Sequence, residues 1–154
     1  MAIEVTIETA IDASPQAVFA RIADVDAWPS WLIASGIVSV ARAGAGPLAA
    51  GERLTVTQRA AGRAGVFDAV AQVLEPPQRL VVDGRDAEGV TIAIEADVAP
   101  ADRGSTLRWS IRIGLPFRYR IFESMAKPQV QHAAALDIEA LRRNLRSSPP
   151  PPNA

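Results

Sequence analysis

Residues 3–32 constrain the fold of this chain more than any other segment. Their first positions alternate between apolar and polar side chains, which predicts a β-strand with one buried face. Ser14 has the side chain of a helix N-cap, and Pro15 suits the first helical position, where its missing N–H removes no hydrogen bond. Apolar residues then recur on one helical face until the sequence Trp28-Pro29-Ser30-Trp31. The chain therefore opens with a strand, a short helix and a double-tryptophan turn.

The middle of the chain is rich in strand patterns separated by glycine- and proline-containing turns. We expect six further strands, at 37–41, 52–60, 65–75, 79–85, 89–99 and 105–113. From about residue 117 to residue 146, apolar residues recur at spacings of three and four, which predicts one long helix. Pro128 lies inside this pattern, so the helix either kinks or restarts there.

Charges on the outward positions of the strands predict which strands are neighbours. The first expected strand shows Glu4 and Glu8 to solvent, the last shows Arg108 and Arg112, and the one before it carries acidic residues. Oppositely charged residues on adjacent strands are favourable. The sequence therefore predicts that the last strand lies between the first strand and the penultimate one.

This order of elements, with its Ser-Pro helix start and its Trp-Pro-Ser-Trp turn, resembles the polyketide-cyclase/START-like family, also called the SRPBCC or birch-pollen-allergen superfamily. The resemblance implies an α+β helix-grip fold. In that fold a curved seven-stranded antiparallel sheet wraps around a long C-terminal helix, with two short helices after the first strand. We expect one such domain over residues 1–146 and a disordered proline-rich tail over residues 147–154.

Composition excludes several classes of function. The formal net charge is -1, which gives no overall attraction to nucleic acid or to anionic membranes. The chain has no cysteine and a single histidine, His132, so we expect no disulfide, no metal site and no cofactor. It has no signal-peptide pattern and no apolar run of the ~18 residues that a membrane span needs. We therefore expect a cytoplasmic monomer or homodimer.

Small residues gather on two surfaces that the fold would bring together. The middle strands point Ala69, Ala71 and Ala96 inward, and the facing side of the final helix is also rich in alanine. Either the helix and the sheet approach closely, or a space stays open between them. Together with the family resemblance, this pattern favours an internal cavity.

The candidate ligand-binding residues are inward-pointing side chains of the sheet, residues of the final helix and the two tryptophans of the turn. The tryptophans either form the mouth of the cavity or cap the end of the sheet, and the polar members could hold water inside it. The set comprises Trp28, Trp31, Leu54, Val56, Gln58, Phe67, Ala69, Ala71, Ala96, Trp109, Tyr119, Phe122, Met125 and Gln129.

Three functions remain open from the sequence. The resemblance favours binding of a small hydrophobic molecule, lipid-like or polyketide-like. A polyketide cyclase or dehydratase is the first alternative, with Gln58, Tyr119 and His132 as candidate catalytic groups, although no recognisable catalytic motif is present. A regulatory interaction protein is the second alternative. A basic cluster at 118–127 either attracts a carboxylate or phosphate headgroup or is simply solvated.

Overall fold

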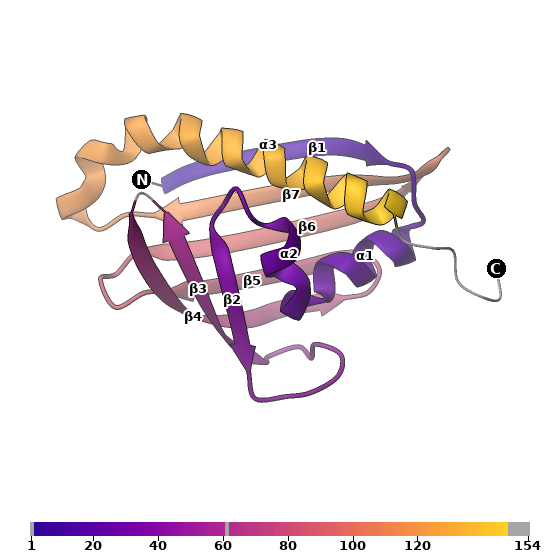
Figure 1. The fold of residues 1–154 in the computed structure, drawn as a ribbon, viewed down its shortest axis with the longest axis horizontal. Coiled ribbons are helices and arrows are strands. Elements are labelled where there is room, and N and C mark those ends of the chain that lie inside the picture. Colours follow the sequence, from indigo (N-terminus) through magenta and orange to yellow (C-terminus); the bar gives the residue numbers. More distant parts are fainter. Residues whose placement is uncertain (1, 61, 148–154) are drawn as a thin grey trace.

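The computed structural model describes residues 2–60 and 62–147, and the expected tail at 148–154 lies outside the described residues. Figure 1 shows a curved sheet with one long helix along it. The strands are β1 (Ala2–Ile11), β2 (Ile37–Arg42), β3 (Arg53–Ala60), β4 (Arg63–Glu75), β5 (Arg79–Arg85), β6 (Thr91–Ala101) and β7 (Gly104–Gly114). The helices are α1 (Pro15–Ala23), the 3-10 helix η1 (Val25–Ala27), α2 (Trp28–Trp31), the 3-10 helix η2 (Phe117–Phe122) and α3 (Glu123–Ser147).

All seven strands form one antiparallel sheet in the order β1-β7-β6-β5-β4-β3-β2. The last strand thus lies between the first and the penultimate one, which confirms the order expected from the charges. Glu4 faces Arg112 across β1 and β7, and their side chains form an ion pair with an N–O distance of 2.8 Å. This exposed pair sets the register more than it stabilises the fold.

The junction after β1 forms as its sequence predicts. The Ser14 hydroxyl accepts a hydrogen bond from the backbone N–H of Ala17 at 3.1 Å, and Pro15 is the first residue of α1. The helix buries Val18 and its two apolar neighbours on the same face. The indole N–H of Trp28 then donates to the carbonyl of Ile22 at 2.8 Å, which fastens α2 to the end of α1.

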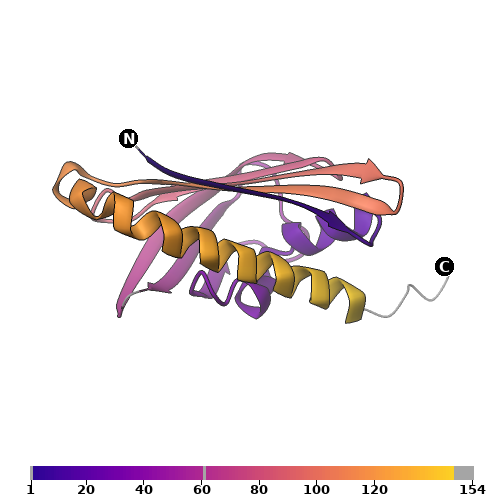
Figure 2. The ribbon, with the colours of Figure 1, turned by 90° about the horizontal axis from the view of Figure 1, so that it is seen from above.

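The final helix has different limits from those predicted from the sequence. Residues 117–122 form the 3-10 helix η2, and α3 begins only at Glu123. It then continues through Pro128 without a restart, and it includes Ser147, which the sequence assigned to the tail. The two views in Figures 1 and 2 show α3 running along the edge of the sheet beside β1, with α1 and α2 under its second half.

An ion-pair network joins three elements next to α2. Arg42 on β2 donates to Glu52 at 2.8 Å and pairs with Asp26 of η1 at 3.1 Å. The hydrogen bond from Arg42 lowers the pKa of the Glu52 carboxyl below its usual value. The network therefore connects β2 and the residue that precedes β3 to the helices that cover one end of the sheet.

Candidate functional site

The inner face of the sheet is sealed at one end and accessible at the other. Along β7 the exposed fraction of the inward side chains rises from 0% at Leu107 through 1% at Trp109 to 6% at Ile111, and Ile113 is only half-buried. The inner faces of β3 and β6 also become more exposed toward this same end, where Gln58 and Ile92 are half-buried. At the same end β4 and β5 have Gly65 and Gly84, which place no side chain on the inner face.

The long helix has the same gradient. Ala134, Ile138 and Leu141 in its second half are fully buried against the core. In its first half, residues 123–133, no side chain is buried, although Ala126 and Val130 partly pack against the core. We call the sheet residues Gln58, Gly65, Gly84, Ile92 and Ile113, together with Ala126 and Val130 of α3, the open end.

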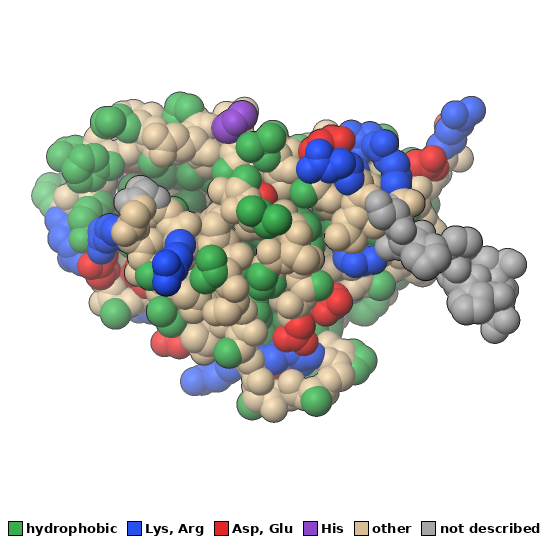
Figure 3. Space-filling view, viewed as in Figure 1, with side chains coloured by type: hydrophobic (Ala, Val, Ile, Leu, Met, Phe, Trp, Pro, Cys, Tyr) green, Lys and Arg blue, Asp and Glu red, His purple; other side chains and the backbone are tan. Residues whose placement is uncertain are grey.

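Space-filling atoms show the same asymmetry on the surface. In Figure 3 green hydrophobic side chains gather at the left of the view, over η2 and the start of α3. The surface is hollowed below this part of the helix, and hydrophobic side chains are visible within the recess. The open end is therefore an apolar opening between α3 and the sheet.

The opposite end is closed by aromatic packing. Trp31 of α2 and Trp109 of β7 meet edge to face, with ring centroids 5.4 Å apart. Neither indole N–H finds a hydrogen-bond partner among the described residues. A buried donor without an acceptor is unfavourable by about 1–3 kcal/mol. A ligand or water oxygen could accept hydrogen bonds from these two N–H groups. In this structure no such atom can reach them, because both nitrogens are enclosed by protein atoms.

The small residues singled out in the sequence lie behind the opening, and Ala96 is the register partner of Trp109. Ala71 and Ala96 have 0% exposed surface, and so has Ala134 on the facing helix. A side chain with no accessible surface touches no space that a water molecule could occupy, inside or outside the protein. At these three positions the protein is therefore closely packed in this structure.

The other predicted ligand-binding residues fall into three groups. Those buried in the interior are Trp28, Leu54, Val56, Phe67 and Ala69. Those on η2 and the start of α3 are the half-buried Tyr119 and the exposed Phe122, Met125 and Gln129. Gln58 lies between these groups, at the open end, and its amide donates to the carbonyl of Ser35 at 2.7 Å.

The candidate catalytic groups are not brought together. The Gln58 amide donates a hydrogen bond to the carbonyl of Ser35, and the Tyr119 hydroxyl lies 3.3 Å from the carboxylate of Glu88. His132 is exposed on α3. Within the described part of the chain, no three His, Cys, Asp or Glu side chains are placed to hold a metal ion.

A buried carboxylate, Asp137, lies beside the open end and was not among the candidate residues predicted from the sequence. Asp137 of α3 is 1% exposed and accepts hydrogen bonds from the backbone N–H groups of Ala34 at 2.8 Å and Ser35 at 3.0 Å. It therefore fastens the loop between α2 and β2 to the long helix. Gly36 lets this loop lie close to β3, because a Cβ at its φ of +79° would sit 2.0 Å from the carbonyl oxygen of Arg59.

Burial raises the pKa of the Asp137 carboxyl, although the hydrogen bonds from the loop act in the opposite direction. The stability that this group contributes is fully present below its ordinary pKa of about 4 and is lost as the pH rises through its higher folded-state pKa. We expect the wild type to lose this contribution to stability as the pH rises from acid to neutral, whereas Asp137→Asn does not. The melting temperature of Asp137→Asn minus that of the wild type should therefore increase over this range. Thermal denaturation of both proteins across this pH range measures the difference.

Glu52→Gln is the matched control, because the pKa of the Glu52 carboxyl is lowered by its hydrogen bond with Arg42. Its contribution is present above the ordinary carboxyl pKa and is lost as the pH falls. This variant should therefore lose melting temperature relative to the wild type as the pH rises. Parallel curves for Asp137→Asn and the wild type would contradict a raised pKa of the Asp137 carboxyl.

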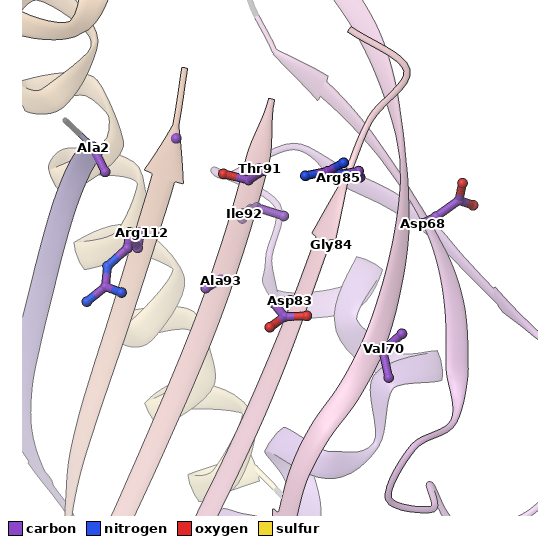
Figure 4. A pocket seen from close by; sticks show the side chains of 11 residues that line it. Ala2, Asp68, Val70, Asp83, Gly84, Arg85, Thr91, Ile92, Ala93 and Arg112 are labelled. Carbon is purple, nitrogen blue, oxygen red and sulfur yellow. The ribbon is translucent and has the colours of Figure 1, made fainter. Parts of the chain in front are cut away.

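Two surface hollows lie outside the inner face of the sheet, and one of them shares Gly84 and Ile92 with the open end. One of about 440 Å³ is on the outer face of the sheet and is lined in part by Asp68, Asp83, Ala93 and Arg112. In Figure 4 these side chains stand in front of the sheet, whereas the helices lie behind it. The second, of about 300 Å³, lies where Asp12 meets Arg142 and Arg146 near the end of α3. Both have charged linings, unlike the apolar open end.

A curved antiparallel sheet closed around one long C-terminal helix, with two short helices after β1, defines the helix-grip class of α+β proteins. The family model described as "Polyketide cyclase / dehydrase and lipid transport" matches residues 2–146. The chain belongs to this family, the SRPBCC family, whose members bind hydrophobic ligands. No curated protein matches the sequence.

Solved structures show the same fold at low sequence identity. The protein of unknown function SA2116 from Staphylococcus aureus matches with a TM-score of 0.74 and 13% identity, over 96% of this chain and 95% of that one. A START superfamily protein from Mycobacterium smegmatis matches with a TM-score of 0.69 and 14% identity, over 94% and 97% of the two chains. Ara h 8.0201 matches with a TM-score of 0.66 and 16% identity, over 96% and 100%.

Sequence reasoning missed part of the opening. Ile92 and Ile113 face it, but their alternation in β6 and β7 indicated only that they point inward. Their distance from the covering helices is a property of the tertiary structure. Asp137 did carry a signal, because it is a charged residue next to the apolar stripe that includes Ala134, Ile138 and Leu141.

Proposed function

We propose that this protein binds a small hydrophobic molecule at the open end, between the first half of α3 and the inner face of the sheet. The observation that carries the proposal is the shared exposure gradient. The inward side chains of three strands, β3, β6 and β7, and those of the helix lose burial toward the same place. If this end of the core served only to stabilise the fold, we would expect other elements to cover it, as α1 and α2 cover the opposite end.

The chemistry of the opening favours an apolar ligand. Its lining includes Ile92, Ile113 and Val130, and Gln58 is its polar side chain. A ligand that removed this surface from water would gain about 25 cal/mol for each Å² of apolar area covered. Because the amide of Gln58 already donates to Ser35, its remaining acceptor could orient one polar group of the ligand.

The extent of the site follows from the packing behind the opening. Ala71, Ala96 and Trp109 lie deeper and are sealed in this structure. A ligand longer than the opening would have to separate α3 from the sheet to reach them. The proposal therefore places the ligand first against the half-buried residues, and deeper binding requires the helix to move.

A titration with anilinonaphthalene sulfonate (ANS), an apolar fluorescent probe, tests this function. We expect saturable binding to one site on the folded protein, with competition by a long-chain fatty acid. Weak binding without saturation, unaffected by the competitor, would contradict the proposal.

A further inference from the structure

The segment that leads into the open end exposes an unusual number of large apolar side chains. Phe117 is 86% exposed, Ile121 is 77% exposed and Met125 is 68% exposed, and Phe122 is half-exposed beside them. We call these four residues the η2 patch. Exposed apolar residues that gather in one place mark a contact surface, whereas isolated ones need no explanation.

Basic side chains accompany the patch. Arg118, Arg120 and Lys127 belong to the same segment, where Glu123 is the only acidic residue, although the whole chain has a net charge of -1. Positive charge is therefore concentrated here against the overall balance.

These basic groups remain available at the surface. The guanidinium of Arg120 lies 5.9 Å from the ring centroid of Phe117, so its charge is held beside the most exposed member of the patch. Arg118 donates to the carbonyl of Glu88 at 2.7 Å. Within residues 2–60 and 62–147, neither Arg120 nor Lys127 forms an ion pair.

We propose that the η2 patch docks on the surface of a membrane that contains anionic lipids. Its apolar side chains would enter the boundary between headgroups and acyl chains, and Arg120 and Lys127 would face the lipid phosphates. This inference rests on the proposed function, because docking would place the open end against the phase in which an apolar ligand dissolves.

Charge argues against a second copy of the chain as the occupant. In a twofold-symmetric dimer the same patch would face itself, and the basic residues of both copies would be brought together. Such like-charge contacts are unfavourable, whereas an anionic bilayer is complementary to them.

Vesicle co-sedimentation tests the proposal. The folded protein should bind vesicles of phosphatidylcholine with phosphatidylglycerol more tightly than vesicles of phosphatidylcholine alone, and high salt should weaken this binding. Phe117→Ser combined with Ile121→Ser, and separately Arg120→Glu combined with Lys127→Glu, should each lower the partition coefficient at least about tenfold.

The controls are Leu136→Ser, an exposed apolar residue elsewhere on α3, and Arg103→Glu, an exposed basic residue in the turn between β6 and β7. Both should bind vesicles like the wild type. All variants should keep ANS binding in vesicle-free solution, so that loss of docking is distinguished from failure of the ligand site.

Equal vesicle binding by the patch variants and the controls would overturn the proposal, and so would the absence of binding to anionic vesicles. A dimer in solution that the Phe117 and Ile121 substitutions dissociate would assign the patch to a second copy instead. Light scattering at several protein concentrations detects that outcome.

Discussion

Replacing Val130 with tryptophan is expected to weaken ANS binding at least about tenfold, a loss of about 1.4 kcal/mol of binding free energy. Val130 is half-buried on α3 at the open end, so the larger ring would fill the space proposed for the ligand. The fold should tolerate the change, because the side chain has room on its exposed side. Fluorescence titration gives the affinity, and thermal denaturation gives the stability.

Leu136→Trp is the matched control on the same helix. Leu136 is half-exposed in the well-packed part of α3, away from the opening, so the same ring there should leave ANS affinity within about twofold. If Val130→Trp bound the probe as tightly as Leu136→Trp, the ligand site would not be at the open end.

Ala71→Phe should lower the free energy of unfolding by about 3 kcal/mol or more, because overpacking of a filled core is unfavourable. Ala71 has no exposed surface, and the phenyl ring would have to displace its neighbours. For a chain of this length the melting temperature should fall by at least about 6 °C. Urea denaturation and calorimetry measure both quantities.

Val66→Phe provides the comparison on the same strand. Val66 is exposed on the outer face of β4, so stability should change by no more than about 0.5 kcal/mol. The cavity predicted from the small inward residues implies the opposite result for Ala71→Phe: a folded, stable protein that no longer binds ANS. That result would show that an internal cavity extends past the open end.

The order of elements could be predicted because each local signal agrees with the fold. Ser14 caps α1, the strands alternate, and Glu4 pairs with Arg112 as the outward charges indicate. The start of the final helix could not be placed in this way, because apolar spacing alone does not distinguish the 3-10 turns of η2 from the first turns of α3.

The location of a ligand site depends on packing that the sequence pattern leaves open. Small residues at Ala71 and Ala96 are compatible both with a cavity and with close approach of helix and sheet, and only the packing distinguishes these cases. The opening depends on where α1, α2 and the second half of α3 cover the sheet. The role of Asp137 depends on a loop about a hundred residues away in the sequence.

Photo-crosslinking with a diazirine-bearing fatty acid, followed by peptide mapping, tests the location of the ligand most directly. The proposed function predicts saturable labelling of Ala126 and Val130 on α3 and of Ile113 on the sheet, with competition by unlabelled fatty acid. Labelling confined to the outer hollow at Asp68, Asp83 and Ala93, with the first half of α3 unlabelled, would contradict it.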